Sequence, residues 1–228
     1  MSVGRLVRGG VHGLGELFIT LGVVLLLFVA WQLWWTDIAA GQTQRALTHQ
    51  LEQQWQAPPR VTGRVAATKL KEIPMGDAFA LIRIPRFGHD YVRPILQGVD
   101  LDILDRGVGH YPQSVDPGEV GNFAVAGHRV TYAKPFNKIA ELRPGDAVVV
   151  ETSDTWYVYR VQRHTIVTPD RVDVVAPVPE QPGKKPTARM MTMTACHPEF
   201  SARERYVVFS VLDQVVPKTG GAIPDALR

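Results

Sequence analysis

Residues 190–209, MMTMTACHPEFSARERYVVF, contain the one cysteine of this 228-residue chain, Cys196. The β-prone runs at 188–195 and 205–212 predict two strands joined by a short polar connection. Cys196 follows the first run, and Arg205 opens the second. A solitary thiol between two strands is either an inert core residue or a nucleophile, and the rest of the sequence bears on that choice.

The composition is that of a globular protein with one sizeable core. The chain is 45% hydrophobic and 21% charged, and its length is short for two full domains. A net charge of +3, with acidic and basic residues interleaved, is too small for a surface that binds nucleic acid. The sequence has no CxxC, HExxH or clustered carboxylate pair, so we expect no metal and no cofactor.

Residues 17–36, LFITLGVVLLLFVAWQLWWT, form an uncharged stretch of the length that crosses a bilayer as a helix. A signal peptide would have a shorter apolar region followed by small residues at a cleavage site. Here the run ends instead in Trp31, Trp34 and Trp35, which suit the membrane interface. The stretch therefore predicts a single transmembrane helix.

The charges on either side of this helix predict its orientation. Arg5 and Arg8 precede it, and Asp37 is the first charge after it. The positive-inside rule then places residues 1–16 in the cytoplasm and the rest of the chain, after the helix, outside the cell membrane. Because exported domains usually carry paired cysteines or none, a single cysteine there indicates a free reactive thiol.

The remaining sequence divides into a stalk, a body and a tail. Within the stalk, 37–77, residues 43–56 place apolar side chains at four-residue intervals and predict a short amphipathic helix. Residues 57–77 read as an extended linker. The body spans residues 78–216, and residues 217–228 are expected to form a flexible tail.

Short apolar runs bounded by turn signals fill the body and predict a mainly β fold. Expected strands cover 78–84, 91–96, 121–126, 147–151, 155–161, 164–167, 188–195 and 205–212. Short helical segments are expected at 99–106 and 134–142, and a long proline-rich loop at 169–187. Seven or eight short strands with little helix favour a closed or nearly closed β-barrel.

A nucleophilic cysteine needs a nearby base or cation, because only the thiolate reacts. Among the seven histidines, His128 stands just past the end of the strand 121–126, a common position for catalytic groups. His110 falls in turn-like surroundings. Arg205 can donate hydrogen bonds to a carbonyl oxygen that develops negative charge. Taken singly, a histidine in this position is more often a hydrogen-bonded structural residue, and Arg205 can be an ordinary surface arginine.

Three motifs together resemble the sortases, the membrane-anchored cysteine transpeptidases of Gram-positive bacteria. TMTAC (192–196) resembles the TLxTC signature, GNFAVAGHR (121–129) the segment that ends in the catalytic histidine, and RYVVF (205–209) the strand opened by the catalytic arginine. With AGHRVTYAKPFNKIAELRPGD and the membrane segment, they look most like class E. The resemblance covers residues 78–214 and implies a sortase-like closed β-barrel of seven to eight strands.

The resemblance also implies a role for each of the three residues. Cys196 would attack the Thr–Gly bond of an LAxTG-like sorting signal, and His128 would protonate the departing amine. Arg205 would hold the oxyanion or the sorting peptide. The implied partners are secreted proteins with C-terminal LAxTG-like signals and an amine of the peptidoglycan precursor.

Substrate contacts are implied at Tyr132, Thr194 and Ala195, and substrate recognition in the loop 169–187. Two positions depart from the family signature. Met193 replaces its leucine, and Ala195 stands where the family has threonine, which removes a hydroxyl expected near the substrate.

Other functions stay open on the sequence. A pilus-polymerising sortase would join one protein to another through a lysine amine. An exported cysteine endopeptidase would resolve the intermediate with water. A membrane-tethered binding module would hold Cys196 as a buried structural residue.

Overall fold

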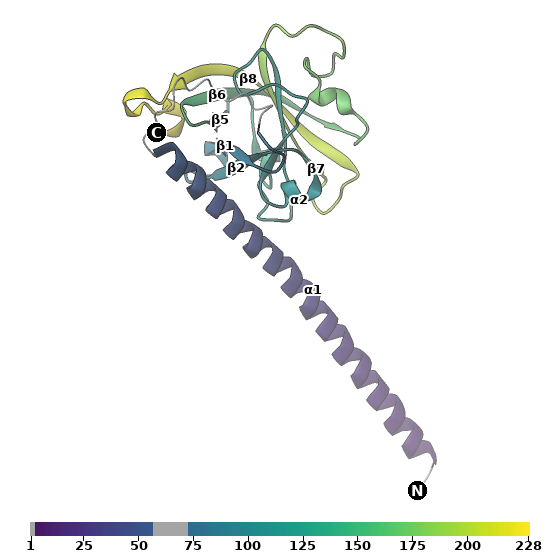
Figure 1. Cartoon of the computed structure of the whole chain (residues 1–228). Coiled ribbons are helices and arrows are strands. Elements are labelled where there is room, and N and C mark those ends of the chain that lie inside the picture. The colour runs from purple at the N-terminus through teal and green to yellow at the C-terminus, as the bar shows by residue number, and fades with distance from the viewer. Residues whose placement is uncertain (1–2, 57–72) are drawn as a thin grey trace.

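The computed structural model describes residues 3–56 and 73–228, which form a β-barrel and a long helix that leaves it (Figure 1). The barrel strands are β1 Ala78–Arg83, β2 Val92–Gln97, β3 Val108–His110, β4 Gly121–Ala126, β5 Ala147–Glu151, β6 Thr155–Val167, β7 Arg189–His197 and β8 Glu204–Pro217. They close in the order β1-β2-β3-β4-β7-β8-β6-β5. The predicted mainly β, closed-barrel fold is confirmed.

Short helical elements connect the strands. They are α2 Leu101–Leu104 and 3-10 turns at Pro85–Phe87, Ile139–Glu141, Val172–Val175, Thr219–Gly221 and Asp225–Leu227. Strand pairs β2–β3 and β4–β7 are parallel, and the other pairs are antiparallel. Because β4 and β7 run in the same direction, their carboxyl ends meet at one end of the barrel.

Alternate side chains of the strands point inward and fill the barrel interior. In β4, Phe123 and Val125 are fully buried, and in β7, Met191 and Met193 join them in the same core cluster. Each such side chain contributes roughly 1.5–3 kcal/mol through burial. The strand ends that carry Cys196 and its neighbours are therefore supported by a rigid core.

Two strands differ from the sequence prediction. β3 was not predicted, and His110, placed in a turn, lies in it with 1% exposure. Three residues are too few to show an alternating pattern, which is why the strand was missed. The runs 155–161 and 164–167 are one long strand, β6, whose pairing with β8 shifts register between Val161 and Arg163.

The N-terminal helix α1, Val3–Gln56, is continuous over 54 residues. The sequence predicted two separate helices, 17–36 and 43–56. No proline interrupts the connection, and Gly41 costs only about 1 kcal/mol in a helix interior, so the helix runs through it. By length and composition, α1 is long and apolar enough to cross a membrane.

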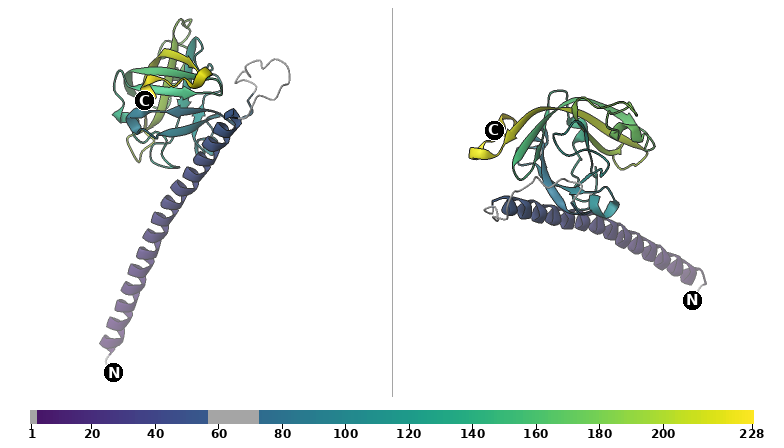
Figure 2. Two further views of the ribbon diagram at one scale, coloured as in Figure 1. Left: turned by 90° about the vertical axis from the view of Figure 1, so that its left-hand side faces the viewer. Right: turned by 45° about the horizontal axis from the view of Figure 1, so that its top comes forward.

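The last turns of α1 run beside the barrel next to β1 and β2, while its N-terminal part projects away (Figure 2). Large apolar side chains of the projecting part, such as Leu17, Phe28 and Trp35, are exposed.

Two further predictions concern the linker 57–77 and the C-terminal segment 217–228. Most of the predicted linker 57–77 lies outside the described residues. The C-terminal segment 217–228, expected to be flexible, forms two 3-10 turns, and its Ala226 and Leu227 pack against the cluster around Trp156. That packing was not anticipated, because the segment carries no periodic apolar pattern.

Candidate active site

Parallel pairing of β4 and β7 brings Cys196 and His128 to the same end of the barrel. Ala126 pairs with Thr194, and the Gly127 N–H donates to the Thr194 carbonyl at 3.1 Å. Cys196 and His128 each follow this pair by two residues. Since side chains two positions apart share a strand face, Cys196 lies on the face of Thr194, outside the barrel core.

Arg205 joins them from the neighbouring strand. It is directly opposite Cys196 in the antiparallel β7–β8 pair, so the two side chains share a face and their β-carbons lie about 5 Å apart. Its Nη1 donates to the carbonyls of Ala202 and Glu204, both at 2.9 Å. These bonds fix the guanidinium near the start of β8 and leave other N–H groups for a ligand.

The imidazole of His128 is held by a carboxylate. Its Nε2 lies 2.9 Å from Oδ1 of Asp105. Because an ionised carboxylate only accepts hydrogen bonds, Nε2 carries the proton, and Nδ1 is the nitrogen left for proton transfer. Asp105 directly follows α2 and belongs to no motif, so sequence reasoning missed it.

Tyr132 lies beside both His128 and Asp105. Its ring packs against the His128 ring with centroids 5.0 Å apart. The negative charge of Asp105, with partial burial and a hydrogen bond from the phenol, raises the pKa of Tyr132 above its ordinary value. The phenol therefore stays protonated and serves Asp105 as a second donor.

Arg129, directly after His128, was also missed by sequence reasoning. It is 6% exposed, and its Nη1 lies 2.8 Å from Nδ1 of His197 and 3.4 Å from the Cys196 carbonyl oxygen. Its guanidinium lies over the Tyr206 ring at 5.7 Å. Arg129 thus ties the end of β7 to the segment that carries His128.

The Cys196 thiol is partly exposed and not in a disulfide. Among residues 3–56 and 73–228 it has no hydrogen-bond partner, so it is open to a substrate. The same residues contain no group of three or more His, Cys, Asp or Glu side chains placed to hold a metal ion.

The three residues predicted to contact the substrate differ in their exposure. Tyr132 is partly exposed beside His128. Thr194 is 5% exposed, and its hydroxyl lies 3.3 Å from that of Tyr111. Ala195 is 3% exposed within the core cluster that contains Tyr206, on the face opposite Cys196. Burial does not favour direct peptide contact by Thr194 or Ala195, so these roles stay predictions.

The proline-rich loop 169–187 covers the outer face of β4 and β7. The Asn122 side-chain amide donates to the Ala176 carbonyl at 3.0 Å, and the Thr192 hydroxyl donates to the Val174 carbonyl at 3.3 Å. The loop therefore flanks β7, the strand that carries Cys196, and its role in substrate recognition stays a prediction.

A partly exposed thiol near a strand end, with a carboxylate-bound imidazole and a guanidinium at the ends of the two neighbouring strands, is an arrangement suited to acyl transfer through cysteine. Comparison with known proteins agrees with that class. The family model described as the sortase domain matches residues 82–213. The chain belongs to the sortase family of cysteine transpeptidases.

Individual relatives are similar over most of the chain. Sortase SrtE1 of Streptomyces coelicolor is 40% identical over 224 residues, which is 95% of this chain and 60% of that protein. Sortase SrtE2 of the same organism is 32% identical over 231 residues, covering 97% and 89%. The crystal structure of S. coelicolor sortase E1 with a tripeptide in its active site has a TM-score of 0.62 and 41% identity, covering 67% and 98%.

Proposed function

We propose that this protein is a class E sortase that cleaves the Thr–Gly bond of an LAxTG-like signal and transfers the protein to a cell-wall amine. The observation that carries this proposal is the convergence of Cys196, His128 and Arg205 at the ends of three adjacent strands. The similarity to two class E sortases and the tripeptide in the active site of one of them support a peptide substrate.

The first half-reaction forms the thioacyl intermediate. The Cys196 thiolate attacks the threonine carbonyl carbon, and the resulting oxyanion accepts hydrogen bonds from the Arg205 guanidinium. The C–N bond then breaks as Nδ1 of the His128 imidazolium gives its proton to the glycine amine. Asp105, bonded to Nε2, stabilises the charged imidazole and keeps Nδ1 free.

The second half-reaction releases the product. An incoming amine attacks the thioester carbonyl, and Nδ1 of His128 takes its proton. The C–S bond breaks and restores the Cys196 thiolate beside the imidazolium. Water in place of the amine would make the enzyme an endopeptidase, and a lysine amine of another protein would make it a pilus-polymerising sortase.

The same proposal includes attachment to the cell membrane through α1. The apolar stretch 17–36 supplies a span of the right length, and Arg5 and Arg8 at its N-terminal side favour a cytoplasmic N-terminus. The barrel then lies outside the membrane, where secreted substrates and cell-wall amines are found.

Mass spectrometry of the full-length protein tests the reaction. After incubation with an LAxTG peptide, the wild-type chain is expected to carry the mass of the acyl fragment on Cys196, and Cys196→Ala is expected to carry none. Adding an amine should convert the adduct into an amide product. Adduct formation on Cys196→Ala, or no adduct with any sorting peptide, would refute the proposal.

A further inference from the structure

Helix α1 contacts the loop that carries His128. We call residues 128–134 the histidine loop. Asp37, on α1, accepts a hydrogen bond from the Ala133 N–H at 3.2 Å through Oδ1. Its Oδ2 lies 2.9 Å from the Lys134 ammonium. One carboxylate of the helix therefore holds both the backbone and a side chain of the loop.

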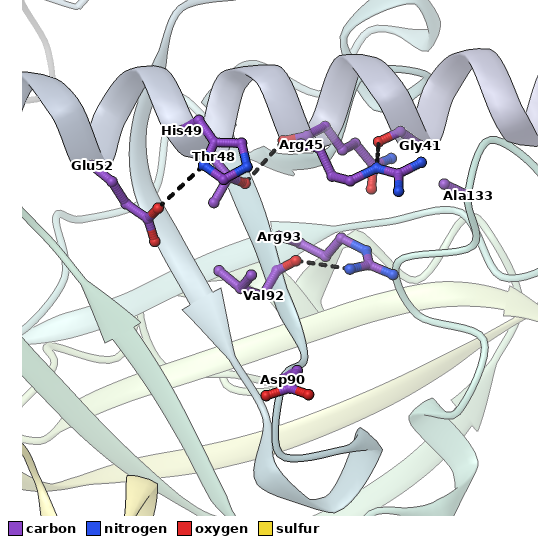
Figure 3. A pocket seen from close by; sticks show the side chains of 10 residues that line it. Gly41, Arg45, Thr48, His49, Glu52, Asp90, Val92, Arg93 and Ala133 are labelled. Carbon is purple, nitrogen blue, oxygen red and sulfur yellow. Dashed lines mark hydrogen bonds and ion pairs between the residues drawn. The ribbon is translucent and has the colours of Figure 1, made fainter.

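A second contact lies two turns further along the helix. The Gln44 side chain is 3% exposed and donates from Nε2 to the Tyr132 carbonyl at 3.0 Å. Between the two contacts the helix passes close to the loop at Gly41, where an added β-carbon would lie 3.7 Å from that of Ala133 (Figure 3). Three successive residues of the loop thus have partners on α1.

These three residues have a backbone conformation that needs support. Tyr132, Ala133 and Lys134 have φ values of 52°, 60° and 50°, in the left-handed region that residues with a side chain disfavour. A conformation of this kind persists where surrounding groups hold it in place, and it is commonly found at active sites. Within the loop, the Lys134 N–H bonds to the Thr131 carbonyl at 2.9 Å. The Ala133 N–H and the Tyr132 carbonyl are instead satisfied by the helix.

The contact belongs to a buried face of α1 that also includes Ala40, Thr48 and Leu51. A cavity of about 500 Å³ lies between α1 and β2, lined by residues that include Arg45, His49 and Arg93 (Figure 3). Beyond it, the helix touches the barrel again through Glu52, whose carboxylate lies 3.1 Å from the Arg83 guanidinium. The hydrogen bonds from Asp37 and Gln44 are the polar contacts of this helix face with the histidine loop.

We propose that Asp37 and Gln44 are positioning residues of the active site. They hold the histidine loop in the conformation in which the Tyr132 ring packs against His128, and so determine where the imidazole lies. This inference rests on the proposed function. Asp37 directly follows the apolar segment 17–36, so the helix that supplies the proposed membrane anchor also sets the geometry of the catalytic histidine.

The test uses the full chain in lipid nanodiscs and the variants Asp37→Ala, Asp37→Asn and Gln44→Ala. Gln53→Ala is the matched control, because Gln53 is exposed on the same helix. Kinetics of thioacyl formation with an LAxTG peptide give kcat and KM, and NMR of labelled histidine reports the His128 ring.

Asp37→Ala and Gln44→Ala are each expected to lower kcat about tenfold and to shift the His128 ring signals, since small displacements of a catalytic group reduce rates steeply. Asp37→Asn keeps an oxygen for the Ala133 N–H and should recover most of the rate. If Asp37→Ala does not fold, the test of the inference rests on Gln44→Ala, which removes a single hydrogen bond.

Rates and ring signals equal to those of Gln53→Ala would overturn the inference. If the wild-type chain itself forms no thioacyl adduct, the proposed function fails. The positioning role of Asp37 and Gln44 is then tested by the His128 ring signals alone. In that case a shift in Gln44→Ala supports the positioning role, and unchanged signals reject it.

Discussion

Asp105 accepts a hydrogen bond from Nε2 of His128 at 2.9 Å, on the side of the imidazole away from Nδ1, the nitrogen that transfers the proton in the proposed mechanism. The same carboxylate raises the pKa of Tyr132. A carboxylate in this position keeps one tautomer of the imidazole and stabilises its charged form. Asp105 thus gives the cysteine–histidine–arginine group a fourth member.

Replacing Asp105 by Asn is expected to lower kcat about 10- to 100-fold, because the imidazolium loses a negative partner and the amide can favour the wrong tautomer. The effect should be smaller than for a fully buried carboxylate, since the Asp105 side chain is 32% exposed. Steady-state kinetics with an LAxTG peptide measure it. Asp102→Asn, exposed on α2, is the control, and equal rates for the two variants would exclude the role of Asp105.

Replacing Arg205 by Lys is expected to slow thioacyl formation about 100-fold, because a lysine keeps the charge but not the planar set of donors. Iodoacetamide alkylation of Cys196 should continue in this variant, since the thiol itself is untouched. Arg203→Lys, at an exposed neighbouring position, is the control. Near-wild-type thioacyl formation by Arg205→Lys would argue that the guanidinium does not hold the oxyanion.

Replacing Ala195 by Thr restores the residue of the family signature. Because Ala195 is 3% exposed in the barrel core, the added methyl and hydroxyl should lower the unfolding free energy by about 1–3 kcal/mol. The value of kcat/KM should change by less than about threefold, since the side chain faces away from Cys196. Denaturant unfolding measures the change in unfolding free energy, and peptide kinetics measure kcat/KM. Ala195→Ser, which adds the hydroxyl without the methyl, separates the effect of polarity from that of volume. A gain in activity above about tenfold would place this side chain in the substrate groove after all.

His110 makes stability depend on pH. Burial lowers its pKa from 6.5 to about 4, so between these values the unfolded chain binds one more proton than the folded chain. The stability contribution is complete above pH 6.5 and falls by about 1.4 kcal/mol per pH unit as the pH drops towards 4. Unfolding measured from pH 7 to pH 4 tests this.

His110→Gln is the companion variant for that measurement. It loses the stacking of the imidazole on Phe123, at 4.9 Å between ring centroids, and should be less stable at pH 7. Its stability should nevertheless depend less steeply on pH between 6.5 and 4, because no imidazole titrates there. A slope equal to the wild-type slope would assign the pH dependence to other groups.

Local patterns predicted most of the strands and the residues that meet at the site. The run 121–126 was predicted with the observed bounds of β4, and Ala147–Glu151 with those of β5. Cys196 and Arg205 were singled out because each stands at the edge of an apolar run, and their cross-strand pairing follows from the antiparallel connection. These features depend on residues close together in the sequence.

The sequence by itself determined the apolar membrane-length segment and the alternation that builds a β-barrel, and it singled out the thiol, imidazole and guanidinium of the candidate site. Only the tertiary structure decided which other groups surround them. Asp105 reaches His128 from 23 residues away, and Asp37 reaches Ala133 from 96 residues away. No periodicity or motif encodes such contacts, because they arise only when barrel closure brings distant loops and the helix together.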